Sequence, residues 1–308
     1  MRGAGLRIAA AFTLDLLIGD PPRSPHPVRA FGALIDMLEQ RFNDRPSASR
    51  LRGGAVAVGL AAGAYGVSWA LLAGARRVDP WFASVLEVGL GASTLASNDL
   101  LREGRSVLEA LEADDLPRAR ANVARIVGRD TLTLTADEIA RAAIETLAES
   151  AADGIIAPLF WLAVGGVPAA LAFKMISTMD SMIGHRDERY AFFGAVAARL
   201  DDAANFVPAR LTAGLIALLC ATPLRVIGTV VRDAGKHESP NAGWPEAAMA
   251  AALDVRLGGT NWYAGYGIVG ARFHESGRSP DEEDVQGAIA LVQRVALAAA
   301  VCAIVARS

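Results

Sequence analysis

The sequence is poor in cysteine and in aromatic residues, and it lacks any block of basic side chains. Cys220 and Cys302 are the only cysteines in 308 residues, and both lie in apolar runs. Cysteines in such surroundings usually behave as small buried hydrophobes, so we expect neither a disulfide nor a cysteine-ligated metal. The net charge of −3 comes from interspersed basic and acidic residues, which excludes the charge pattern of a protein that binds nucleic acid.

Apolar residues, in contrast, are abundant. Hydrophobic residues make up 53% of the chain and its mean hydropathy is +0.31, which is high for a soluble protein. A helix that crosses a membrane needs about 20 predominantly apolar residues. Three stretches approach or satisfy this need: residues 53–74, 155–173 and 288–306. We therefore expect a membrane protein in which these stretches are spans.

Three further apolar stretches are shorter or contain a charged residue, namely 8–19, 81–97 and 206–223. Each is compatible with a span, a re-entrant helix or a buried core helix. We interpret the first as a retained helix, because Asp15 and the lack of a small-residue cleavage site argue against a removable signal peptide. Arg210 would be costly in a lipid-facing span. Residues 206–223 are therefore predicted to form a re-entrant or protein-buried helix that leaves 185–202 and 236–246 on the cytoplasmic side.

Two polar stretches show helical periodicity. Residues 101–126 and 134–152 combine apolar residues at helical spacing with many charged residues, which predicts amphipathic helices outside the bilayer. Thr135 and Glu138 have the spacing of a capping box. We find no strand pattern of useful length and no internal repeat. The sequence predicts an all-α, polytopic integral membrane protein with amphipathic extramembrane helices, organised as a single domain over residues 1–308.

Glu145, Glu149 and Asp153 follow one another at intervals of four residues, which would place three carboxylates on one face of a helix. Like charges at this spacing cost a few tenths of a kcal/mol per pair, so something should compensate. A solvated helix face is one interpretation. A site for a divalent metal or a basic substrate is the other, because hard cations bind oxygen ligands.

A second cluster of charges lies in KMISTMDSMIGHRDERY at 174–190 and in ARLDDAAN at 198–205. Asp180 and Asp187 would share a helical face, and the arginines that flank Asp187 suggest phosphate binding. A surface network of salt bridges is the alternative. Asp201, Asp202 and Asn205 offer oxygen ligands on one helical turn, although an exposed helix start explains them as well.

Short motif matches carry little weight here. HRD at 185–187 is typical of a protein-kinase catalytic loop, but Phe192 stands where that loop needs asparagine. The G-x-G-x-x-G that begins at Gly265 has no strand–helix–strand context. DGIIA at 153–157 matches the start of the signature of membrane CDP-alcohol phosphotransferases, although Pro158 replaces its arginine. That metal-dependent class is kept as the alternative function.

The stretch HESPNAGWPEAAMA at 237–250 is unusually polar for this chain. Prolines restrict its backbone, Gly243 permits close approach of a ligand, and Trp244 offers a flat apolar surface suited to a large ring. A structural turn packed around the tryptophan is one interpretation, and a binding loop is the other.

Four ordered blocks are ESAADGIIAPLFW, KMISTMDSMIGHRDERYAFFG, ARLDDAANFVPARLTA and GKHESPNAGWPEAAMAAALDVRLGG. Together they resemble the CobD/CbiB family of cobalamin biosynthesis, the adenosylcobinamide-phosphate synthases. The likeness begins at LDLLIGDPPRSPHPVRAFG, residues 14–32, and runs nearly the whole chain. The least typical places are Glu238 and the region around Trp262.

The resemblance implies an integral membrane enzyme that joins aminopropanol, or its O-phosphate, to the f-side-chain carboxylate of adenosylcobyric acid. The bond formed would be an amide, made by an ATP-dependent acid–amine ligase. The resemblance further implies Mg²⁺, a multi-pass location in the bacterial inner (cell) membrane, and contact with the lipid bilayer and with other corrin-pathway enzymes.

The resemblance also gives roles to individual residues. His237, Glu246 and Asn241 would be catalytic, with His237 or Glu246 taking the proton of the attacking amine and Asn241 orienting a carbonyl or phosphate. The phosphate- and substrate-binding residues would be Lys174, Arg186, Arg189, Lys236 and Trp244. The metal ligands would be Asp180, Asp187, Asp201, Asp202, Glu149 and Asp153.

Three functions of different classes stay open: the amide-forming synthase, the membrane phosphotransferase, and a membrane scaffold or transporter without chemistry. A phosphotransferase would need a nucleotide-alcohol donor and no ATP. A transporter would place charged residues inside its spans, whereas most charged residues of this sequence lie in connecting segments.

Overall fold

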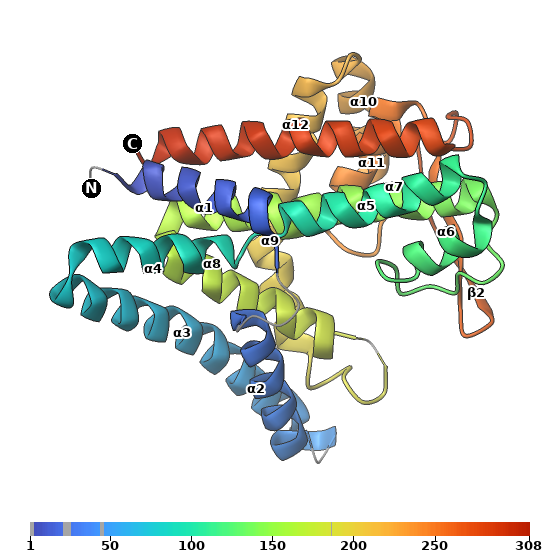
Figure 1. Cartoon of the computed structure of the whole chain (residues 1–308). Helices are drawn as coiled ribbons and strands as arrows, with labels where there is room; N and C mark the ends of the chain where they lie inside the picture. The colour runs from blue at the N-terminus through green and yellow to red at the C-terminus, as the bar shows by residue number, and fades with distance from the viewer. Residues whose placement is uncertain (1–2, 21–25, 44–45, 186) are drawn as a thin grey trace. The chain divides into compact units, whose positions relative to one another are not determined.

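The computed structural model of the chain describes residues 3–20, 26–43, 46–185 and 187–308 (Figure 1). The chain divides into two compact units, each made from several stretches. Unit 1 comprises Met1–Ala96, Ala157–Asn205 and Ala300–Ser308, and unit 2 comprises Ser97–Ile156 and Phe206–Ala299. The single domain expected over residues 1–308 stays a prediction.

Unit 1 is built from helices whose starts are set by local sequence signals. They are α1 (Ala4–Ile18), α2 (Pro27–Phe42), α3 (Pro46–Val78), α4 (Pro80–Ala92), α8 (Ala157–Ile183), the first part of α9 (Ala195–Leu219) and the end of α12 (Glu282–Ala306). Asp79 caps α4 by accepting the Phe82 N–H at 2.6 Å, and His26 caps α2 in the same way. Proline follows each cap, where its missing N–H costs nothing.

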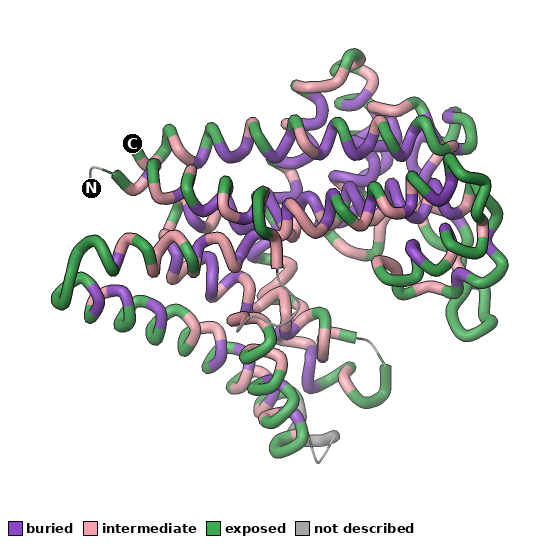
Figure 2. The backbone as a smooth tube through the Cα atoms, viewed as in Figure 1, coloured by how far each residue is buried: buried purple, intermediate pink, exposed green. Residues whose placement is uncertain are grey.

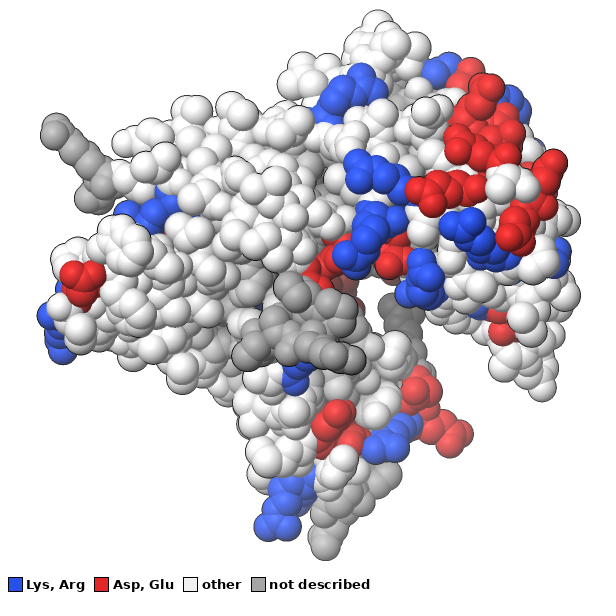
Figure 3. Space-filling model, viewed as in Figure 1, with Lys and Arg blue, Asp and Glu red and all other residues white. Residues whose placement is uncertain are grey.

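Three helical stretches are long and apolar enough to cross a membrane: Arg50–Val78, Ala136–Ile183 and Glu282–Ala306. They contain residues 53–74, 155–173 and 288–306, so the three strongest span predictions are confirmed by length and composition. Figure 3 shows that α3 and α4 present a largely uncharged surface between their ends. No other helix among the described residues meets these criteria. Residues 206–219 form the second part of α9, and the re-entrant or buried placement of 206–223 stays a prediction.

The core of unit 1 lies where α2, α3, α8 and α9 meet. Its buried side chains include Ile35, Leu60, Met179 and Phe193. Gly53 of α3 lies so close to the Phe193 carbonyl that any side chain at this position would overlap it. Small residues of this kind allow close packing between apolar helices.

α8 is interrupted at Gly166, whose φ of 71° and ψ of −166° lie outside the helical region. Pro168 follows and has no N–H to rejoin the helical ladder. The break leaves backbone groups that need other partners. One of them, the carbonyl of Ala163, accepts a hydrogen bond from Arg307 Nε at 2.5 Å.

Unit 2 has shorter helices and a hairpin. Its elements are α5 (Ser97–Glu112), α6 (Leu116–Val123), α7 (Ala136–Ala151), a π-helical turn (Ala152–Ile156), the second part of α9, α10 (Pro223–Asp233), a 3₁₀ turn (Ala234–Lys236), α11 (Gly243–Leu253), β1 (Leu257–Tyr263), β2 (Tyr266–Phe273) and most of α12. Buried residues concentrate on α7 and α11 (Figure 2). The capping box of Thr135 and Glu138 is present at the start of α7, as predicted.

The stretch 101–126, predicted to be helical and amphipathic, forms most of α5 and all of α6. Asp114 has a left-handed φ of 53°, and the Asp115 side chain accepts the Arg118 N–H at 3.1 Å to cap α6. Pro117 occupies the first turn of α6. The helical prediction is confirmed, and these local signals make a break that the continuous apolar periodicity does not reveal.

The sequence shows no strand pattern of useful length, yet the structure contains two short strands. β1 and β2 form an antiparallel hairpin, with an irregularity between Gly258 and Thr260. Gly258, Gly259 and Gly265 all take positive φ, which glycine adopts without strain. Most hairpin side chains are exposed, so no alternation of apolar and polar residues signals the strands in the sequence. Helices still dominate the fold, in agreement with the predicted class.

Candidate functional site

Three glutamates of unit 2 approach one another where α7 and α11 pack. Glu246 on α11 and Glu145 on α7 are each only 7% exposed, and Glu149 lies one turn further along α7. Burial, followed by the negative charges of Glu145 and Glu149, raises the pKa of the Glu246 carboxyl well above its ordinary range, and Arg129 offsets this only in part. Glu246 therefore holds its proton at pH values where an exposed glutamate does not.

Glu145 is fixed in place as a negative charge beside Glu246. Arg129 donates to its Oε2, and the N–H of Gly258 donates to its Oε1 at 2.7 Å. Arg129 also donates to Asn261 Oδ1 on β1. These bonds tie the hairpin to α7, and they satisfy Glu145 as an ionised carboxylate.

His237 lies on the more exposed side of Glu246. Its Nε2 is 3.7 Å from Glu246 Oε1, and its Nδ1 accepts the Ser239 N–H at 2.9 Å. A neutral imidazole accepts through one nitrogen and carries hydrogen on the other, so this bond assigns the hydrogen to Nε2, on the side of the glutamate. The ring also stacks on Phe273 with centroids 6.2 Å apart. The orientation of His237 is thus fixed by its own loop and by β2.

Arg210 of α9 reaches the loop before α11. Its guanidinium lies 3.6 Å from the ring centroid of Phe206 and 4.4 Å from that of Trp244. It donates to Asn241 Oδ1 at 2.8 Å and to the Pro240 carbonyl at 3.2 Å. The charge that argued against a lipid-facing span is therefore bound by protein. Any role of Trp244 or Asn241 in binding substrate must accommodate this arginine.

Lys236, predicted to bind phosphate, pairs with a buried aspartate. Its Nζ lies 2.7 Å from Asp233 Oδ1, and Asp233 also accepts from Arg232 Nε and from the His274 N–H, both at 2.9 Å. Burial alone would raise the pKa of Asp233, but these donors outweigh burial and lower the pKa to about 2. Asp233 is therefore a firmly ionised centre that holds three segments together.

The sequence predicted Asp153 as the third carboxylate beside Glu145 and Glu149. In the structure, Glu246 of α11 takes that place. Asp153 lies in the π-helical turn that follows α7. Such a turn bonds over five residues and breaks the four-residue repeat of an α-helix. Turns of this kind are frequent at functional sites, and Asp153 stays a predicted metal ligand.

An oxygen-rich corner occurs in unit 1. The carboxylates of Asp180 on α8 and Asp202 on α9 are close enough for their charges to interact. Asn205 donates to Asp201 Oδ2 at 3.0 Å, and its own Oδ1 is buried without a hydrogen-bond partner in the described part of the chain. Carboxylate and amide oxygens of this kind fit Mg²⁺. No three histidine, cysteine, aspartate or glutamate side chains among the described residues form a ready metal site, so the predicted ligand set stays a prediction.

Asp187 and Arg189, two other predicted residues of unit 1, form hydrogen bonds within the protein. Asp187 Oδ1 accepts the N–H groups of Arg189 and Tyr190 at 3.0 and 2.9 Å, as aspartate often does in a turn. The Arg189 guanidinium donates to both carboxylate oxygens of Glu39, at 3.0 and 2.9 Å. These hydrogen bonds lower the pKa of Glu39. Lys174 is half-buried on α8, and Arg186 lies outside the described residues.

A family model described as CobD/Cbib protein matches residues 8–292. The chain belongs to the CobD/CbiB family. It is 42% identical over 292 residues to the cobalamin biosynthesis protein CobD of Klebsiella pneumoniae, covering 92% of this chain and 91% of that protein.

Two further CobD/CbiB proteins show similar agreement. Identity to the CobD protein of Geobacter metallireducens is 46% over 274 residues, covering 86% of this chain and 85% of that one. Identity to the CbiB protein of Salmonella typhimurium is 40% over 289 residues, covering 92% and 91%. No solved structure gives a significant match. The resemblance found in the sequence is confirmed.

The sequence of this CobD/CbiB protein identified only part of the cluster in unit 2. Glu246, His237 and Glu149 were singled out as functional, and the structure brings them together. Arg129 and Asn261 were missed. Arg129 bonds to Glu145 across 16 residues of chain and to Asn261 across 132, and no local sequence pattern predicts contacts of that kind.

Proposed function

We propose that this CobD/CbiB protein forms an amide bond in cobalamin biosynthesis. It would join (R)-1-amino-2-propanol, or its O-phosphate, to the f-side-chain carboxylate of adenosylcobyric acid, giving adenosylcobinamide or its phosphate. Family membership supports the role in cobalamin biosynthesis. The observation that carries the proposed chemistry is the buried Glu246, because a carboxyl with a raised pKa suits proton transfer near neutral pH.

The charge of the cluster favours an amine donor. Glu246 faces two further glutamates, Glu145 and Glu149, and the nearby arginines Arg129 and Arg141 both pair with Glu145. Such a site attracts an alkylammonium ion and repels a nucleotide-linked donor with its phosphates. This difference favours amide ligation over the CDP-alcohol phosphotransferase.

Glu246 is the better candidate for the base. When the amine attacks the acyl carbon, a C–N bond forms, the activated oxygen leaves, and the proton of the amine needs an acceptor. His237 Nδ1 already accepts the Ser239 N–H, and its Nε2 carries the hydrogen. We therefore assign the proton to Glu246 and treat His237 as a positioning residue that orients its carboxylate.

ATP with Mg²⁺ would supply the activation of the corrinoid carboxylate. In unit 1, Asp180, Asp202 and Asn205 present oxygens that suit the cation, and Lys174 would bind phosphate. The three apolar helices suggest membrane association. A multi-pass location in the bacterial inner membrane, beside other corrin-pathway enzymes, is part of the proposal.

The test is a reaction of the full chain, purified in detergent, with adenosylcobyric acid, Mg²⁺, ATP and either amine donor. The expected product is a corrinoid heavier by the donor less one water, with ATP consumed in step. Glu246→Gln should form this product about 10²–10⁴-fold more slowly. Glu238→Gln, which removes the same charge from an exposed neighbour in the same loop, should react like wild type. Product made from a CDP-linked donor without ATP would instead support the phosphotransferase.

A further inference from the structure

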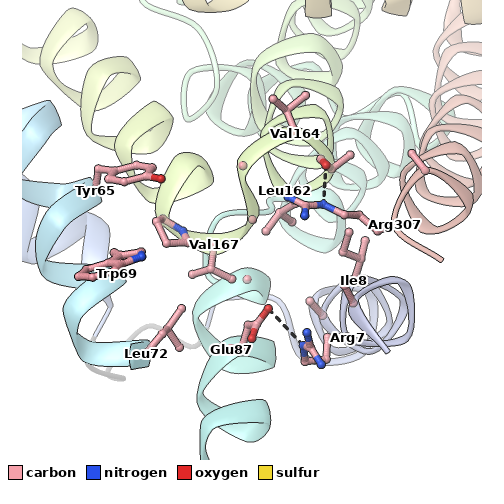
Figure 4. Close-up of a pocket in the computed structure, with 18 of the residues that line it drawn as sticks. Arg7, Ile8, Tyr65, Trp69, Leu72, Glu87, Leu162, Val164, Val167 and Arg307 are labelled. Carbon is pink, nitrogen blue, oxygen red and sulfur yellow. Dashed lines mark hydrogen bonds and ion pairs between the residues drawn. The ribbon is translucent and has the colours of Figure 1, made fainter. Parts of the chain in front are cut away.

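Unit 1 contains a cavity of about 740 Å³ between α1, α3, α4, α8 and the end of α12 (Figure 4). The broken segment of α8, residues 162–168, forms one wall. The residues proposed above for catalysis, phosphate or metal do not line this cavity. It therefore needs an explanation separate from the amide chemistry.

Positive charge is in excess in the cavity wall. Arg7 Nε and Arg76 Nη2 share the two oxygens of Glu87, at 3.2 and 3.0 Å. Arg307 donates to the neutral carbonyl of Ala163. Glu87 is the one carboxylate among the described side chains that line the cavity, so three guanidinium side chains face a single acidic side chain. A second anion would be attracted here.

Most of the remaining wall is apolar, and much of it comes from α3 and α8, which lie in two of the candidate spans. Tyr65, Trp69 and Leu72 lie along one face of α3 and lead to Arg76 in its last turns. Tyr65 and Trp69 are 45% and 59% exposed although they line the cavity, so the cavity opens along the side of α3. All three candidate spans contribute to the wall.

The charged end of the cavity lies where the spans end. Arg76 precedes the end of the span Arg50–Val78, and Arg307 directly follows Ala306, the last residue of another. In Figure 1 the turn between α3 and α4, the start of α1 and the end of α12 lie at the same end of unit 1. Guanidinium groups at this position lie where lipid headgroups meet a span.

We propose that this cavity binds one anionic phospholipid of the surrounding bilayer. Its headgroup phosphate lies between Arg7, Arg76 and Arg307, and an acyl chain follows Tyr65 and Trp69. Guanidinium groups give phosphate strong charge-assisted hydrogen bonds, and basic pockets between transmembrane helices recognise anionic headgroups. A free phosphate compound would use the arginines alone and leave the apolar wall uncovered. The inference is independent of the proposed ligase reaction.

Native mass spectrometry of the delipidated full chain tests the proposal, with phosphatidylglycerol and phosphatidylcholine as probes. We expect one phosphatidylglycerol per chain and several-fold weaker retention of phosphatidylcholine. Arg76→Gln should weaken phosphatidylglycerol binding about fivefold, the effect of one basic group near a lipid surface. Arg77→Gln removes the same charge from the next residue of α3, which does not line the cavity, and should leave binding unchanged. Equal retention of both lipids, or equal losses in both variants, overturns the proposal.

Two further arms separate the proposal from misfolding and from a free phosphate ligand. Glu87→Gln should strengthen phosphatidylglycerol binding, because it removes the competing carboxylate, and a misfolded chain would not gain affinity. Inorganic phosphate at millimolar concentration should fail to displace the lipid. Displacement by phosphate alone, or weaker binding in Glu87→Gln, contradicts a lipid site.

Discussion

Asp233 and Glu246 are both buried carboxyls of unit 2, 1% and 7% exposed, yet their surroundings are opposite. Asp233 is surrounded by donors from Arg232, Lys236 and the His274 N–H, and its pKa falls to about 2. Glu246 faces two other glutamates, and its pKa rises well above the ordinary range. Burial alone therefore does not decide the state of a carboxyl. The partners decide it, and an excess of like charge is typical of a functional site.

The two sites also contribute to stability in opposite pH ranges. The pKa of Asp233 is lowered on folding, so its stabilisation is present above the ordinary value of 3.8 and is lost as the pH falls toward 2. The pKa of Glu246 is raised on folding, so the stability that its protonated form contributes is present below 4.5 and is lost as the pH rises through the folded value. At neutral pH the ionised Asp233 therefore stabilises the fold, whereas the buried Glu246 lowers its stability.

The largest expected effect is that of Glu246→Gln. Loss of the proton acceptor should lower the rate of amide formation by about 10²–10⁴-fold. The midpoint of thermal unfolding at pH 8 should stay the same or rise, because an ionised carboxyl is no longer held among like charges. Rates of product formation and thermal unfolding in detergent measure both. A variant that loses activity and stability together would make Glu246 a structural residue like Asp233.

Asp233→Ala should show the reverse pattern. It leaves the His274 N–H and two charged side chains without their acceptor, which should lower the free energy of unfolding by about 2 kcal/mol. The rate per folded molecule should change little, because Asp233 has no role in the proposed reaction. Chemical unfolding at pH 7 and pH 3 provides the check, since the deficit against wild type should shrink at the lower pH. A deficit independent of pH would contradict the ionised Asp233 centre.

Features of the fold that depend on a local sequence pattern could be predicted. The span at residues 53–74 follows from its apolar length, and the start of α7 follows from the spacing of Thr135 and Glu138. The sequence could also place His237 and Glu246 together, because one short polar loop and the turn after it carry both. The hairpin was missed because its exposed, glycine-rich strands bury no apolar face. Arg129 was missed because its link to Asn261 crosses 132 residues of chain.

The next largest effect is that of Glu149→Gln, which tests what raises the pKa of Glu246. Glu149 contributes to the raised pKa and lies at the surface of α7, so solvent screens its charge. Glu149→Gln should lower the pKa of Glu246 and move the acidic limb of the rate profile to lower pH by a fraction of a unit. Glu109→Gln, which removes an exposed charge from α5, serves as the control. If the acidic limb of the rate profile does not move in Glu149→Gln, burial and Glu145 alone raise the pKa of Glu246.

The smallest effect tests whether Lys236 belongs to the Asp233 centre or to the proposed substrate site. Lys236 is about half exposed, and Arg232 and the His274 N–H would remain on Asp233, so Lys236→Gln should cost less than about 1 kcal/mol of stability. Arg232→Gln is the matched control, because it removes another cation from the same carboxylate and has no predicted contact with phosphate.

The two variants should therefore lose similar stability and differ in kinetics. If Lys236 also binds the phosphate of a substrate, Lys236→Gln alone should raise KM for ATP or for aminopropanol phosphate, with kcat little changed. The phosphorylated and unphosphorylated donors, measured side by side, show which phosphate is bound. Equal KM values in both variants would remove Lys236 from the proposed site and leave it wholly to Asp233, which would sharpen the separation between the two buried carboxyls of unit 2.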